Sequence, residues 1–309
     1  MTRMPSTAVT WKRGVFCILL IVLAIAMAAR LRQRVWPLAQ REIHDYDLCF
    51  SLKSTTRGYD IVIPGDSRVY RGVSPSAMRQ VFPRARILNF GFSSGGLAPP
   101  LLDQAANALS EESNIRALVI GVTPFSLTTE AAANEHIKEH LQESQTEAGL
   151  QRTLALFGAF DPLVDPPTLA LQGGGATQRF FRDGWVASQT DQENHAEGLR
   201  IYREHFARVQ VSLEIQNAFM DTVASWRKQG IRIYAFRPPT CPEMVALEDE
   251  QSGFVEAEFV AAFTSAGGVW LPMPGSYHCY DGSHLEARAA TAFSLRLATA
   301  VAEHMAEDR

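Results

Sequence analysis

The chain has 309 residues, of which 46% are hydrophobic and 20% are charged. This is an ordinary globular composition, ample for one large core, and the absence of any internal repeat excludes a repeat protein. The formal net charge of −4 argues against a nucleic-acid partner, because proteins that bind nucleic acid present a basic surface.

The N-terminus differs in kind from the rest of the chain. Residues 14–29 carry no charge, and basic residues flank them on both sides. This segment is shorter than the roughly 20 residues that span a membrane comfortably, although flanking arginines can reach the interface. It is either a signal peptide, with a small-x-small cleavage site at residues 26–28, or an uncleaved anchor. We predict a cytoplasmic tail and membrane anchor over residues 1–34, followed by a linker over residues 35–57.

From residue 58 onwards, apolar strands alternate with helices. The predicted strands cover residues 60–64, 86–90, 116–122, 231–236 and 269–272, and the predicted helices cover residues 75–82, 97–109, 193–229 and 285–307. The alternation predicts an α/β domain over residues 58–309, with a five-stranded parallel sheet between two helical layers, a three-layer α/β/α architecture. Residues 127–228 are a long insertion between the third and fourth strands. Its turn-rich part, residues 161–175, is a candidate rim or lid.

Two short segments at opposite ends of this domain carry a serine, an aspartate and a histidine. Ser67 ends a Gly-Asp-Ser tripeptide directly after the first strand, and Asp281 and His284 lie three residues apart before the last helix. A serine hydroxyl is a poor nucleophile at neutral pH and needs an adjacent base that a third group holds in place. The carboxyl ends of parallel strands meet at one edge of the sheet, so the three side chains are expected to meet there. The alternative is a plain turn and a helix N-terminus without chemistry.

The order serine, aspartate, histidine and the local sequences resemble the SGNH (GDSL-type) hydrolase superfamily, over roughly residues 58–126 and 229–305. The resemblance implies a flavodoxin-like three-layer fold and acyl transfer through an acyl-serine, and we predict no cofactor. It implies that Ser67 is acylated and that His284 is the general base. Asp281 would orient His284 and stabilise its charged form.

The same resemblance implies hydrogen-bond donors for the oxyanion that forms during acyl transfer. The Ser67 N–H is the first donor. The glycine-rich stretch after the second strand resembles the family's second block, so Ser94 or Gly95 supplies another, with the register open by one residue. Thr123 stands where the family has an asparagine, which predicts a weak or absent third donor, and Asn134 is an alternative.

Other residues near the expected site have two interpretations each. Arg68 and Arg71 follow the nucleophile, and Arg237 ends the fourth strand at the same edge. All three are candidate contacts for an anionic substrate group, although surface arginines need no such role. Cys241 and Cys279 fall at the carboxyl ends of neighbouring strands. They are compatible with a disulfide in an oxidising compartment or with two unpaired thiols.

The missing asparagine makes the chain resemble divergent, membrane-anchored members of the superfamily, such as alginate O-acetyltransferases and lipoteichoic-acid D-alanylation proteins. We therefore predict an extracytoplasmic serine acyl esterase or O-acyltransferase that acts on an envelope carbohydrate or lipid ester, beside a membrane-bound acyltransferase partner. The alternatives are a catalytically weak domain that binds a glycan or that acyltransferase, and a nucleotide-binding domain, which lacks the expected glycine-rich phosphate loop. No metal site is predicted, because His136 and His140 have no third ligand.

Overall fold

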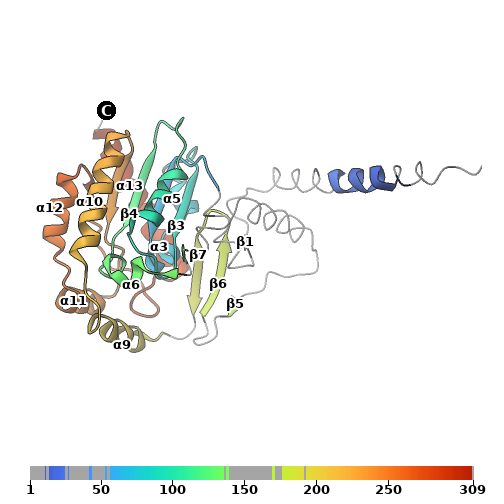
Figure 1. Ribbon diagram of the computed structural model, residues 1–309. Coiled ribbons are helices and arrows are strands. Elements are labelled where there is room, and N and C mark those ends of the chain that lie inside the picture. The colour runs from blue at the N-terminus through green and yellow to red at the C-terminus, as the bar shows by residue number, and fades with distance from the viewer. Residues whose placement is uncertain are drawn as a thin grey trace, which may run out of the picture.

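The computed structural model describes residues 11, 14–24, 27, 42–43, 53, 56–135, 137–138, 169–170, 176–190 and 193–307. Five short strands pair side by side at its centre (Figure 1). They are β2 (Ile61–Gly65), β3 (Ile87–Gly91), β4 (Ala117–Gly121), β8 (Arg232–Phe236) and β9 (Val269–Trp270). Their order across the sheet is β3-β2-β4-β8-β9, and every neighbouring pair is parallel. This is the flavodoxin-like order, so the predicted five-stranded parallel sheet is confirmed.

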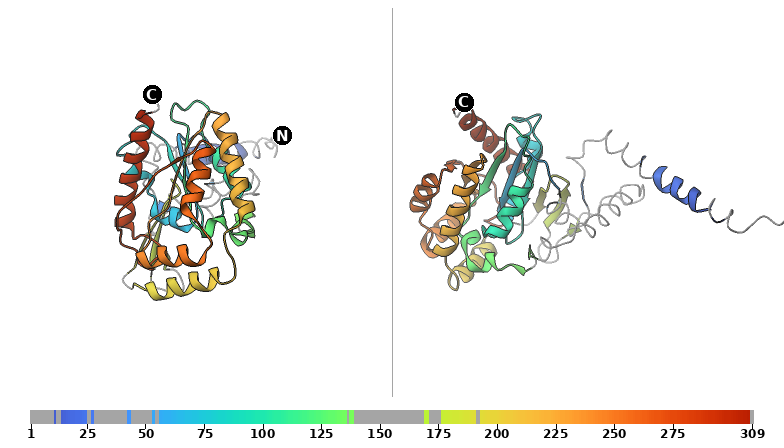
Figure 2. Two further views of the ribbon diagram at one scale, coloured as in Figure 1. Left: turned by 90° about the vertical axis from the view of Figure 1, so that its left-hand side faces the viewer. Right: turned by 45° about the horizontal axis from the view of Figure 1, so that its top comes forward.

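Helices cover both faces of the sheet, and Figure 2 shows α13 and α10 on opposite sides. The first face carries α3 (Ser67–Gly72), α4 (Pro75–Met78) and α13 (Ala287–Glu307), and the second carries α5 (Pro99–Asn107), α10 (Leu213–Lys228) and α12 (Glu256–Ser265). Side chains alternate between the faces along a strand. Ile61 and Ile63 therefore share a core with Phe293, whereas Val62 shares the other with Phe219. The three-layer architecture is confirmed.

The helix predicted over residues 193–229 is wrong, because two helices occupy this stretch. They are α9 (His195–Phe206) and α10, separated by residues 207–212. Ser212 begins α10 as its N-cap, where its hydroxyl accepts a hydrogen bond from the Ile215 N–H. The break lets α9 lie beside α11 (Pro242–Gln251) at one end of the sheet, as both figures show. Neither α11 nor α12 is predicted by the sequence analysis.

Part of the predicted insertion forms a second, antiparallel sheet. Three of its strands come from the insertion, β5 (Leu169–Ala170), β6 (Ala176–Phe181) and β7 (Val186–Thr190), and the fourth, β1 (Glu42–Ile43), comes from the predicted linker. The turn between β6 and β7 covers the outer edge of β3, where the Asn89 N–H donates to the Asp183 carbonyl over 2.8 Å. Gly184 is needed in this turn, because its φ is +83° and a Cβ would collide with the Asn89 carbonyl. Of the predicted lid, all but residues 169–170 lies outside the described residues.

The segment predicted as an anchor is described at residues 11, 14–24 and 27, where the backbone is helical and the side chains are exposed. Among the described residues, no helix combines the length and the apolar character needed to cross a bilayer. The predicted membrane anchor therefore finds no support in this part of the chain. The extracytoplasmic location and the acyltransferase partner stay predictions.

Candidate active site

Ser67 is the first residue of α3, where the chain turns sharply out of β2. Asp66 caps this helix, because its Oδ1 accepts a hydrogen bond from the Arg68 N–H over 2.9 Å. Gly91 on the neighbouring strand lets α3 approach closely, since a Cβ there would lie 2.5 Å from the Tyr70 nitrogen. Together, these contacts hold Ser67 at the carboxyl edge of the sheet, where strand order reverses and ligands bind in such folds.

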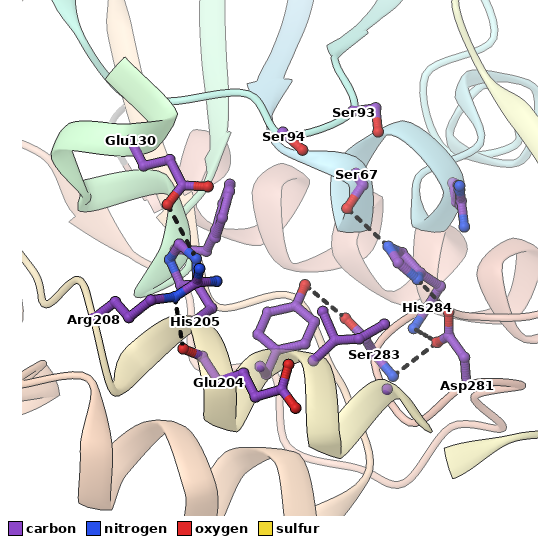
Figure 3. Close-up of a pocket in the computed structure, with 15 residues that line it drawn as sticks. Ser67, Ser93, Ser94, Glu130, Glu204, His205, Arg208, Asp281, Ser283 and His284 are labelled. Carbon is purple, nitrogen blue, oxygen red and sulfur yellow. Dashed lines mark hydrogen bonds and ion pairs between the residues drawn. The ribbon is translucent and has the colours of Figure 1, made fainter. Parts of the chain in front are cut away.

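The loop before α13 brings Asp281 and His284 to this edge. Asp281 Oδ1 accepts hydrogen bonds from the backbone N–H groups of Ser283 and His284 over 2.9 and 2.7 Å. Gly282 permits this turn with a φ of +79°. Asp281 Oδ2 lies 2.7 Å from His284 Nδ1, and His284 Nε2 lies 2.8 Å from Ser67 Oγ. Figure 3 shows the resulting series of contacts from the carboxylate through the imidazole to the hydroxyl.

The electrostatics favour a neutral imidazole between two polar partners. Burial lowers the pKa of His284 below its ordinary value of 6.5, and the Asp281 carboxylate offsets this only in part. Burial alone would raise the pKa of Asp281, but His284 and two backbone N–H groups outweigh it and hold that pKa well below its ordinary value. At neutral pH, His284 can therefore donate from Nδ1 to Asp281 and accept at Nε2 from Ser67.

The backbone N–H groups of Ser67 and Ser94 are the candidate oxyanion donors that remain without a described partner. The Ser67 N–H is the first of α3 and has no intrahelical partner. Ser94 lines the adjoining cavity with a left-handed φ of +56°, and neither N–H donates to another described residue. The Gly95 N–H is already engaged, because it donates to the Phe92 carbonyl over 3.0 Å. Asn134 holds this loop instead of facing the cavity, since its Nδ2 donates to the Ser94 carbonyl over 3.2 Å.

Thr123 does not line the cavity. Its hydroxyl donates to Asp66 Oδ2 over 2.6 Å, and its Oγ1 accepts a hydrogen bond from the Ser126 N–H over 3.1 Å. Both Thr123 and Asp66 are buried. Thr123 was a candidate for a weak third oxyanion donor, but its hydroxyl is committed to Asp66, the cap that precedes the nucleophile.

A cavity of about 410 Å³ opens beside Ser67. Figure 3 shows that its opposite wall carries Glu130, Glu204, His205 and Arg208. The His205 Nδ1 lies 3.4 Å from a Glu130 carboxylate oxygen, and burial lowers the pKa of His205 below its ordinary value. The wall facing the serine is therefore rich in polar and charged groups.

Two of the three arginines predicted as substrate contacts, Arg68 and Arg237, do not line this cavity. The Arg68 side chain is 1% exposed, and its Nη2 lies 2.5 Å from Glu248 Oε1. The other oxygen of this buried carboxylate lies 3.0 Å from Arg237 Nη2. Arg237 Nη1 also pairs with Asp249 and Glu256, at 2.8 and 2.9 Å. The predicted contacts are wrong because Glu248 supplies an internal counter-charge from α11, a helix that the sequence analysis does not predict.

The sequence analysis missed Asn89, but it named Arg71 as a candidate substrate contact. Asn89 is buried in β3, and its Nδ2 donates to the carbonyl oxygens of Val69 and Val73 over 2.7 Å each, which holds the C-terminal end of α3. A polar residue within an apolar strand was the available signal. Arg71 lines the cavity four residues after Ser67, one helical turn along α3.

Neither cysteine predicted near the site, Cys241 or Cys279, lines the cavity. Cys241 and Cys279 are free, buried thiols, and burial raises the pKa of Cys279 to about 12. The described residues hold no group of three or more His, Cys, Asp or Glu side chains arranged for a metal ion. His136 and His140 lie outside the described residues.

No protein-family model matches this chain, and no curated protein matches it. Among solved structures, the chain is similar to a carbohydrate acetylesterase family member from Sinorhizobium meliloti. The two share 12% identity with a TM-score of 0.34, over 79% of this chain and 97% of the other. A similarity at that TM-score does not indicate a function, and the evidence for function is the geometry around Ser67.

Proposed function

We propose that the protein is a serine esterase that forms an acyl-serine intermediate at Ser67. The observation that carries this proposal is the hydrogen-bonded series Asp281–His284–Ser67, which opens into the cavity at the carboxyl edge of the sheet. Nucleophile, base and orienting group within hydrogen-bond reach are the signature of nucleophilic acyl transfer.

The proposed reaction has two halves. Ser67 Oγ attacks the ester carbonyl while its proton passes to His284 Nε2, and Asp281 stabilises the imidazolium. The carbonyl oxygen becomes an oxyanion that accepts hydrogen bonds from the N–H groups of Ser67 and Ser94. The tetrahedral intermediate then collapses, the alcohol leaves with the proton from His284, and the acyl group stays on Ser67. In the second half, water, or an acceptor hydroxyl in the case of transfer, attacks the acyl-serine carbonyl while its proton passes to His284. The bond between Ser67 Oγ and the acyl group then breaks, and His284 returns the proton to Ser67.

The wall opposite Ser67 favours a carbohydrate ester over a lipid ester. Glu130, Glu204 and Arg208 supply carboxylates and a guanidinium for hydroxyl groups, whereas a long acyl chain needs an apolar channel. The Tyr202 ring adds a flat surface for a sugar ring. We propose an acylated carbohydrate as the substrate, with a small acyl group.

Among the described residues, two backbone N–H groups are proposed as oxyanion donors in place of the family's three, so simple esters should react slowly. Loss of one donor typically costs about 10²–10³ in kcat. Transfer to a bound acceptor is the second candidate function, favoured by the polar wall, which can hold an acceptor sugar beside the acyl-serine.

Acetylated oligosaccharides and p-nitrophenyl acetate test the proposal. We expect the wild-type protein to release acetate from both, with the higher kcat/KM on the oligosaccharide, and Ser67→Ala to release none. Mass spectrometry of the products, after an unacetylated oligosaccharide is added as acceptor, distinguishes transfer from hydrolysis. Full activity in the Ser67→Ala variant would overturn the proposed function. A folded wild-type protein that binds the oligosaccharide but never turns it over would favour the binding domain.

A further inference from the structure

One buried arginine joins the nucleophile helix α3, the loop that bears Asp281 and His284, and α9 at the cavity wall. Arg68 follows the nucleophile on α3, yet its side chain points into the protein and is 1% exposed. We propose that Arg68 is a positioning residue that locks the nucleophile helix to the loop bearing Asp281 and His284. This inference rests on the proposed function.

The first link runs from Arg68 to the loop. Arg68 Nε donates to Ser283 Oγ over 3.0 Å, and the Ser283 N–H donates to Asp281 Oδ1 over 2.9 Å. Ser283 is 1% exposed, so water does not compete for its hydroxyl. The guanidinium on the nucleophile helix therefore fixes the residue that lies between Asp281 and His284. This contact limits how far the serine and the imidazole can move apart.

The second link runs from Arg68 to the cavity wall. The Ser283 hydroxyl donates to the Tyr202 hydroxyl over 3.0 Å, and the Arg68 Cζ lies 5.0 Å from the centre of the Tyr202 ring. Tyr202 lies on α9 and lines the cavity. One planar guanidinium thus contacts both the loop and the wall, and a lysine ammonium lacks the fork geometry to do so.

The third link gives Arg68 its orientation. Glu248 on α11 is fully buried, and its two oxygens accept from Arg68 and Arg237. A buried ion pair is weak evidence for stability, because well-packed apolar residues of similar volume are often at least as stabilising. Removing one partner alone, by contrast, leaves an unpaired buried charge. We infer that the Arg68–Glu248 ion pair orients the Arg68 side chain. Replacing both partners together therefore tests the effect on positioning separately from the effect on the free energy of unfolding.

The test compares a double variant with a matched control. Arg68→Met combined with Glu248→Leu removes the pair without leaving either charge alone, and Arg237 keeps Asp249 and Glu256 as partners. The control, Arg237→Met, removes the other arginine of Glu248 but touches neither the loop nor the cavity. Misplacement of reacting groups by about 1 Å can cost about 10²-fold in rate. We expect a kcat lower by about 10–100-fold in the double variant, with KM and thermal unfolding close to wild type, and an unchanged kcat in the control.

Each outcome decides one question. A folded double variant with wild-type kcat overturns the positioning role. Wild-type protein that hydrolyses p-nitrophenyl acetate leaves the proposed function intact in that case. An equal loss of kcat in the Arg237→Met control also overturns it, because the effect would then follow from the charge cluster as a whole. If the double variant does not fold, Ser283→Ala takes its place, since this change removes the acceptor of Arg68 Nε and the donor to Tyr202 but leaves the buried ion pair intact. An unchanged kcat in Ser283→Ala overturns the role. Folded wild-type protein that hydrolyses no ester and is not modified at Ser67 by a fluorophosphonate overturns the proposed function itself.

Discussion

The Thr123 hydroxyl donates to Asp66 Oδ2 over 2.6 Å inside the protein, one residue before the nucleophile. Thr123→Val keeps the shape of the side chain and removes this donor. A hydrogen bond to a charged group contributes about 1.5–3 kcal/mol net. Asp66 Oδ1 keeps the Arg68 N–H, so the cap survives in part. We expect a loss of about 2 kcal/mol, which lowers Tm by about 4–8 °C for a domain of this size.

Thermal unfolding and p-nitrophenyl acetate hydrolysis together test this reasoning. The kcat should fall by less than about tenfold, because the hydroxyl supports the nucleophile's cap and binds no reacting atom. Thr222→Val is a matched control, since that hydroxyl donates to the Ala218 carbonyl of its own helix over 2.7 Å. A fall in kcat of about 10²–10³ with an unchanged Tm would refute the reasoning, because that pattern marks the loss of an oxyanion donor.

Three further predictions concern the base, the oxyanion and the helix behind the nucleophile. Activity should be present above the pKa of His284 and lost as pH falls through it, with the acid limb of the kcat/KM profile below pH 6.5. Arg71→Gln removes a cation that lowers this pKa, so it should move the acid limb to higher pH, and a shift to lower pH would contradict the assignment. Ser94→Gly should keep kcat within about threefold while relieving a strained φ worth about 1 kcal/mol, because the backbone N–H is the donor; a loss of about 10² would implicate the hydroxyl. Asn89→Ala leaves two buried carbonyls of α3 without its amide, so urea unfolding should show a loss of about 3 kcal/mol, and an unchanged midpoint would contradict this role.

The sheet and the meeting of Ser67, Asp281 and His284 could be read from local patterns. Short apolar segments before turns predict buried parallel strands, and the carboxyl ends of such strands fall at one edge whatever the intervening chain does. The proximity of Ser67 and His284 in space could therefore be predicted although they lie far apart in the sequence. The strand pairing in the sheet confirms this part of the reasoning.

Long-range polar partners could not be read in the same way. Arg68 and Arg237 were placed at the correct edge, but their pairing with Glu248 spans 180 and 11 residues and depends on a helix without a clear apolar stripe. Thr123 was placed in the correct block, yet the destination of a hydroxyl depends on side-chain geometry that no spacing encodes. The hairpin of β6 and β7 was missed because its residues alternate only weakly between polar and apolar.

Covalent labelling by a fluorophosphonate tests the central claim most directly. A neutral His284 that accepts the Ser67 proton predicts one label per chain, located on Ser67 by peptide mass spectrometry. The His284→Ala variant should label at least about 10²-fold more slowly, because a general base contributes about 10²–10⁴-fold. Folded wild-type protein that takes no label, or takes it on a serine other than Ser67, would contradict the account.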